Sequence, residues 1–121
     1  MPAGWLNALA DPRLGRALSF VHSDIAEPWT VARLATEVGM SRSAFAALFT
    51  RTVGQPPLDY IRSWRLVLAR LMLANGENNV AQVAMRVGYA SQSAFSHAYR
   101  RVFAVPPRST PAGHSNRRRG T

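Results

Sequence analysis

Cysteine and lysine are both absent from this 121-residue sequence, and its apolar residues form no long run. Without cysteine the chain has no disulfide bond, no thiolate metal ligand and no cysteine nucleophile. No apolar run approaches the ~18 residues of a membrane-spanning helix, and the N-terminus lacks the charged-then-apolar layout of a secretion signal. We therefore expect a cytoplasmic protein with no membrane partner.

Acidic residues are scarce, and their distribution is uneven. Six acids stand against fifteen arginines, which gives a net charge of +9 and a pI near 11.7. Such a charge indicates a polyanionic partner, either nucleic acid or an anionic membrane surface. Without the residues after Pro107 the charge is still +5, because eleven arginines remain against the six acids. Residues 79–121 hold seven arginines and no acid, so the second half is the more electropositive.

Capping residues, prolines and glycines divide the chain into helices. Five residues that favour helix N-caps each precede apolar residues at helical spacing: Asp11, Thr30, Ser41, Asn79 and Ser91. The predicted helices are 12–26, 31–38, 42–53, 58–74, 80–87 and 92–103. No stretch alternates like a strand, so we expect an all-α fold with about seven helices. Residues 1–11 are expected to be a lead-in or linker, and 108–121 a disordered basic tail.

An internal repeat is the most informative feature. Residues 31–57 align with residues 80–107, with Ala90 as a single insertion, and roughly half of the aligned positions are identical. Each copy has a short helix with a small residue, Ala35 or Ala84, where the next helix must cross closely, and then a glycine turn. The predicted organisation is a first helix-turn-helix subdomain, a connecting helix and a second subdomain, at 12–57, 58–74 and 75–107.

The second helix of each copy combines an apolar face with a face of polar or small residues, as a helix in a DNA major groove requires. A single pattern of this kind is equally typical of an ordinary helical hairpin. Two copies joined by a helix, in a chain this basic, favour DNA binding. The alternative is a helical protein-interaction module that contacts an acidic partner.

Three segments resemble the DNA-binding domain of the AraC/XylS family of regulators: ATEVGMSRSAFAALFTRTVGQPP, YIRSWRLVLARLML and VAMRVGYASQSAFSHAYRRVFAVPP. The resemblance covers residues 12–107. The opening GWLNALADPRLGRAL is similar to the segment that follows a cupin-like sensor domain in one branch of the family. The resemblance implies two helix-turn-helix subdomains bridged by a long helix, with the second helix of each in successive major grooves.

The resemblance also implies which residues contact bases: Arg42, Ser43, Ala46 and Ala47 in the first copy, and Gln92, Ser93, Ser96 and His97 in the second. Arg42, His97 and Arg100 can donate to guanine, and Gln92 suits adenine. The first set is smaller than the bulkier polar residues often found at these positions in the family.

Other arginines are candidates for phosphate contacts: Arg51, Arg62, Arg100 and Arg101. Ion pairs with Glu37 or Asp59 are the alternative for Arg51, Arg62, Arg65 and Arg101, and we favour pairing for Arg65 and phosphate for Arg101. The arginines at 117–119 would add non-specific attraction or no binding energy.

The expected partners are double-stranded DNA and RNA polymerase, and we expect no cofactor, metal or enzymatic activity. Some DNA-repair methyltransferases carry a domain of this family, but their chemistry needs a cysteine, which this chain lacks. A longer protein could add a sensor domain that binds a small-molecule effector and dimerises. The connecting helix would be ~25 Å long, and successive major grooves lie ~34 Å apart. One chain should therefore recognise an asymmetric site without a dimer.

Overall fold

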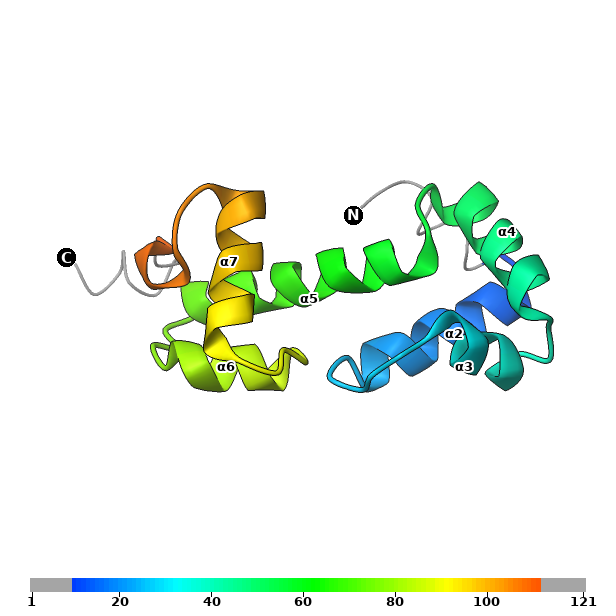
Figure 1. Ribbon diagram of the computed structural model, residues 1–121, viewed down its shortest axis with the longest axis horizontal. Coiled ribbons are helices and arrows are strands. Elements are labelled where there is room, and N and C mark those ends of the chain that lie inside the picture. Colours follow the sequence, from blue (N-terminus) through cyan, green and yellow to red (C-terminus); the bar gives the residue numbers. More distant parts are fainter. Residues whose placement is uncertain (1–9, 112–121) are drawn as a thin grey trace. The chain divides into compact units, whose positions relative to one another are not determined.

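The computed structural model describes residues 10–111, and all regular secondary structure in that range is helical (Figure 1). It comprises six α-helices and one 3₁₀-helix: α2 (Pro12–Ser23), α3 (Val31–Glu37), α4 (Arg42–Val53), α5 (Pro57–Ala74), α6 (Val80–Arg86), α7 (Gln92–Phe103) and η1 (Pro107–Ser109). The predicted all-α fold is confirmed, with a 3₁₀ turn in place of a seventh α-helix in this range. None of these helices is long and apolar enough to cross a membrane. The predicted lead-in lies almost wholly outside the described residues.

The predicted capping residues begin the helices as expected. Asp11 accepts a hydrogen bond from the Arg13 backbone N at 2.9 Å. The Arg13 guanidinium donates to the same carboxylate and holds the pKa of Asp11 below its ordinary value. Four further side chains each accept a hydrogen bond from the backbone of the helix that follows them: Thr30, Ser41, Asn79 and Ser91. These bonds satisfy amides that the first turn of a helix leaves without a partner.

The first helix, α2, ends at Ser23, earlier than the predicted residue 26. An uninterrupted helix would bond the carbonyl of Asp24 to the backbone N–H of residue 28, but Pro28 has no N–H. That carbonyl instead accepts hydrogen bonds from the Glu27 backbone N at 3.1 Å and from the Trp29 indole Nε1 at 2.8 Å. The predicted end was wrong: a turn whose hydrogen bonds run to the Asp24 carbonyl replaces the last helical turn.

The chain divides into two compact units, and the boundary between Ser63 and Trp64 falls within α5. In the first unit, α2, α3, α4 and the start of α5 enclose a core that includes Leu14, Leu18, Leu34, Phe45, Phe49 and Tyr60. In the second unit, the rest of α5 packs with α6 and α7 around Leu66, Ala69, Leu73, Val83, Ala84, Val87, Phe95 and Tyr99. Each unit therefore has a hydrophobic core of its own.

A titratable contact between His22 of α2 and Tyr60 of α5 lies at the first core. The His22 Nε2 lies 2.8 Å from the Tyr60 hydroxyl, and the Tyr60 ring packs on Phe49 with 5.8 Å between ring centroids. Burial lowers the pKa of His22 from its ordinary value of 6.5, because the charged imidazolium is poorly solvated there. Between the folded and the unfolded pKa, the unfolded chain binds more protons, so acid favours unfolding.

We expect the first unit to lose stability as the pH falls below about 6.5, the unfolded pKa of histidine. Urea unfolding at about pH 8 and pH 5 should give a lower midpoint in acid. His22→Gln leaves Tyr60 a polar partner without a titrating group, and its midpoint should change less over this range. Equal wild-type midpoints at both pH values would contradict the role given to His22.

In the second unit, the chain remains ordered beyond Pro107, the predicted end of the fold. Pro107 is buried and begins η1, and the Tyr99 hydroxyl is hydrogen-bonded to the Thr110 hydroxyl. Residues 108–111 were predicted to belong to a disordered tail, and the structure corrects that boundary. The remainder of the predicted tail lies outside the described residues.

Candidate nucleic-acid interface

The two repeats have closely similar local structures. The first helices, α3 and α6, are both 7 residues long, and the second helices, α4 and α7, are both 12 residues long. Gly39 and Gly88, in the turns between them, have φ angles of 72° and 100°, which other residues rarely adopt. Position by position, 41–50 and 91–100 have the same sequence of buried, half-buried and exposed residues.

The helix caps hold α4 and α7 at equivalent starting points. Ser41 accepts a hydrogen bond from Ala44 N at 3.2 Å, and Ser91 accepts one from Ala94 N at 3.1 Å. One face of each helix is buried through an aromatic pair, Phe45 with Phe49 in α4 and Phe95 with Tyr99 in α7. The opposite face of each helix is therefore left toward solvent.

The candidate base-contacting residues lie on that opposite face or at its border with the buried face. In α4, Arg42, Ser43 and Ala47 are exposed, whereas Ala46 is half-buried. The same distribution occurs in α7, where three of the candidates are exposed and one is half-buried: Gln92, Ser93, His97 and Ser96. Each set of four thus shares one face of one helix, with one set in each unit.

The arginines of α4 and α7 differ from several others in their ion pairing. Four arginines elsewhere each pair with an acid: Arg13 with Asp11, Arg33 with Glu27, Arg62 with Asp59 and Arg86 with Glu77. Within residues 10–111, no ion pair is formed by the arginines of α4 and α7, which are Arg42, Arg51, Arg100 and Arg101. All four are exposed, so their charges are available to an external anion.

Arg62 was a candidate for phosphate, with an ion pair as the alternative. The structure pairs it with Asp59 one helical turn earlier, and both side chains are largely exposed. An exposed pair of this kind contributes about 0–1 kcal/mol and is easily exchanged for another partner. Arg65 is half-buried on the same helix.

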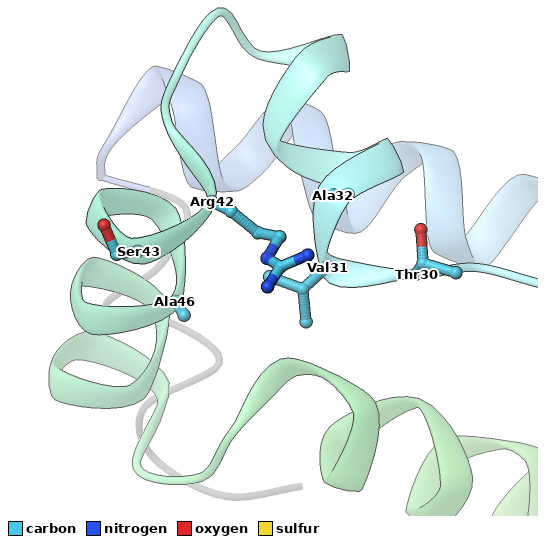
Figure 2. Close-up of a pocket in the computed structure, with 6 residues that line it drawn as sticks. All are labelled: Thr30, Val31, Ala32, Arg42, Ser43 and Ala46. Carbon is cyan, nitrogen blue, oxygen red and sulfur yellow. The ribbon is translucent and has the colours of Figure 1, made fainter.

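A hollow of about 510 Å³ opens beside α4 in the first unit, and Figure 2 shows its lining. The residues around it are Thr30, Val31, Ala32, Arg42, Ser43 and Ala46. The Arg42 side chain extends from the start of α4 toward Val31 at the start of α3 (Figure 2). This hollow explains why Ala46 is half-buried, since it faces the neighbouring helix of its own motif.

The second unit has a hollow of about 530 Å³ beside α7, lined by Asn78, Asn79, Val80, Ala81, Gln92 and Arg108. Arg108 was not among the candidate residues, because sequence analysis placed it in the tail. The match of Pro57 with Pro107 at the ends of the two repeats was a signal that the ordered chain reaches this far.

Comparison with known proteins identifies the family. The sequence profile of a helix-turn-helix domain family matches residues 34–112. An AraC-like transcription regulator from Streptomyces lividans is 49% identical over 105 residues, which are 87% of this chain and 34% of the relative. The chain thus spans about a third of the length of the curated relatives it matches.

Two solved structures have the same fold. A transcriptional regulator of the AraC-type DNA-binding class from Chromobacterium violaceum is 33% identical, with a TM-score of 0.77, and the match covers 86% of this chain and 93% of that one. The DNA-binding domain of AdpA, solved in complex with a target DNA, is 28% identical, with a TM-score of 0.74, over 80% of this chain and 86% of that one. The chain therefore belongs to the AraC-type family of helix-turn-helix DNA-binding domains.

Proposed function

We propose that this chain binds double-stranded DNA sequence-specifically as the DNA-contacting part of a bacterial transcription regulator, with α4 and α7 in adjacent major grooves. The observation that carries the proposal is the set of exposed arginines on α4 and α7 that no acid of the described chain neutralises. Family membership supports it, as does the AdpA domain, which was solved with DNA.

The order of side chains around α4 supports a division of roles. Arg51 follows Arg42 by about two and a half turns at 3.6 residues per turn, so the two arginines lie on opposite sides of the helix axis. Ser43, Ala47 and Thr50 lie between them on the exposed face. A helix in the major groove has a phosphate backbone on either side and base edges ahead. Arg42 can therefore contact either phosphate or a base, whereas Arg51 suits phosphate.

The order around α7 is similar, but more of its side chains can donate hydrogen bonds. Ser93, His97 and Arg100 occupy the middle of the exposed face, with Gln92 at one edge and Arg101 at the other. Arg101 corresponds to Arg51, so we assign it to phosphate. Arg100 borders both regions, and it can contact a phosphate or a guanine.

The remaining partners belong to the proposal as well. A domain of this family would act in the cytoplasm on DNA and on RNA polymerase. In a longer protein, a sensor domain would bind an effector and dimerise. The domain itself is proposed to bind without catalysis.

Binding to duplex DNA should weaken steeply with salt. Because each arginine–phosphate contact releases a condensed cation, the slope of log K against log salt concentration should have a magnitude of ~5–9. Fluorescence anisotropy with a labelled duplex, titrated at several salt concentrations, measures this slope. Selection from a random-sequence library then shows whether one sequence is preferred.

The arginines at 117–119 provide the control for this measurement. A variant with alanine at all three should lose at most ~3 units of slope, at ~0.9 per phosphate contact, and keep the same preferred sequence. A slope near zero on every duplex would rule out DNA binding. Tight binding to an acidic protein, without preference among duplexes, would favour the protein-interaction alternative.

A further inference from the structure

The two hollows beside α4 and α7 occupy equivalent places in the repeat. Thr30, Val31 and Ala32 line the first, and the aligned residues line the second: Asn79, Val80 and Ala81. The two volumes, about 510 and 530 Å³, are nearly equal. Each hollow lies where the first helix of the motif meets the exposed face of the second. The same concave surface has therefore been kept in both units.

The cation in each hollow comes from a different place in the sequence. In the first unit it is Arg42, the first residue of α4. The aligned residue of α7 is Gln92, which is uncharged, and the second hollow instead contains Arg108 from η1. Each hollow thus has one arginine, although the repeat alignment predicts none for the second.

Arg108 is held in place by the end of the fold. Pro107 is buried, Ser109 N donates to the carbonyl of Pro106 at 3.0 Å, and the Thr110 hydroxyl is hydrogen-bonded to the Tyr99 hydroxyl of α7. The Arg108 side chain is exposed and forms no ion pair with any described residue. Its backbone is therefore fixed beside α7, while its charge is left without a partner.

We propose that Arg108 contacts the DNA phosphate backbone and supplies in the second hollow the charge that Arg42 supplies in the first. The inference rests on the proposed function. When the second helix of a helix-turn-helix lies in the major groove, the first helix crosses the sugar-phosphate backbone. The concave surface between the two helices then faces that backbone, and a guanidinium there can form charge-assisted hydrogen bonds to phosphate. The DNA-binding surface of the second unit thus extends beyond the repeat to η1.

Arg108→Ala should weaken binding to all sequences alike. The loss of one phosphate contact should lower the slope of log K against log salt by ~0.9, which corresponds to about eightfold weaker binding at 0.1 M salt. The probes are a mixed-sequence 30-base-pair duplex and the best duplex that the wild-type chain selects from a random library. Both should lose affinity by the same factor, and thermal unfolding of the free variant should be unchanged because the side chain is exposed.

Arg70→Ala is the matched control, since it removes one exposed arginine without a described ion pair from the α5 part of the same unit, and Arg70 does not line the hollow. For this control, the slope of log K against log salt should change by less than half of the change expected for Arg108→Ala. The decisive variant adds Gln92→Arg to Arg108→Ala, which moves the charge to the position that it has in the first unit. This double variant should regain the wild-type slope on the mixed-sequence duplex.

Three outcomes separate this inference from the proposed function. A wild-type chain that binds neither duplex contradicts the proposed function itself. Normal wild-type binding with an unchanged slope in Arg108→Ala overturns the assignment of Arg108 alone. A loss in Arg108→Ala that Gln92→Arg does not restore shows that Arg108 acts outside the hollow, which also overturns the inference.

Discussion

Phe95→Ala should lower the free energy of unfolding by about 3–5 kcal/mol, the usual cost of removing a fully buried phenylalanine. Phe95 has no exposed surface, and its ring packs against Tyr89 and Tyr99 with centroid distances of 5.5 and 5.6 Å. Small domains are stable by only 5–15 kcal/mol in total, and units of this size lie toward the lower end. The variant should therefore unfold the second unit at moderate urea concentrations.

The repeat supplies a matched variant, because Phe45 occupies the aligned position and is equally buried. Phe45→Ala should cost a similar amount in the first unit. Val102→Ala, near the C-terminal end of α7 with 61% of the Val102 surface accessible, should change stability by less than about 0.5 kcal/mol. Urea unfolding followed by circular dichroism compares all three. A Phe95→Ala midpoint equal to that of Val102→Ala would show that Phe95 does not centre the second core.

Elements with strong local signals at both ends were predicted accurately. α4 and α7 have the predicted bounds, 42–53 and 92–103, because a serine caps each start and a helix-breaking Pro-Pro pair follows each end. The exposed faces of both helices also followed from the 3.6-residue period, because that period alone determines which side chains share a face.

Features that depend on contacts between distant residues were missed. The turn after α2 is closed in part by Trp29, whose indole donates a hydrogen bond to the carbonyl of Asp24. The hydrogen bond between the Tyr99 and Thr110 hydroxyls ties the chain just after η1 to α7. A three-residue helix has no sequence periodicity from which η1 could have been predicted. Each hollow is lined by residues of more than one helix, so its lining was not visible in any helix alone.

The two exposed helix faces differ in what they can offer a base pair, and we expect unequal contributions to sequence preference. Ser43 and Ala47 on α4 have short side chains, and alanine can only touch a thymine methyl. Gln92, Ser93 and His97 on α7 offer donors and acceptors to base edges, in the half of the chain without acids. The α7 half of the site should therefore be the more strictly specified.

Gln92→Ala and His97→Ala should each relax preference at particular base pairs by about 1–3 kcal/mol, or roughly five- to 150-fold, the range for a good base contact. Arg101→Ala should instead weaken binding to all sequences alike, because a phosphate contact carries no base information. Selection from a random-sequence library, with wild type and the three variants in parallel, distinguishes the two kinds of loss. Both α7 side chains are exposed, so unfolding of the free variants should be unaffected.

Ala47→Leu tests α4 by adding side-chain atoms, whereas the α7 variants remove them. Ala47 is exposed on α4, and leucine is a good helix former, so Ala47→Leu should leave the stability of the free chain within about 0.5 kcal/mol. With α4 in the major groove, alanine at position 47 allows the helix to approach the base edges closely. The larger leucine side chain would clash with them, so affinity for DNA should fall. Enlarging Ala46 is a weaker test, since that residue also faces the hollow beside α3. Sharper base preference opposite α4 than opposite α7 in the selected sequences would show that the short side chains of α4 are the more discriminating set.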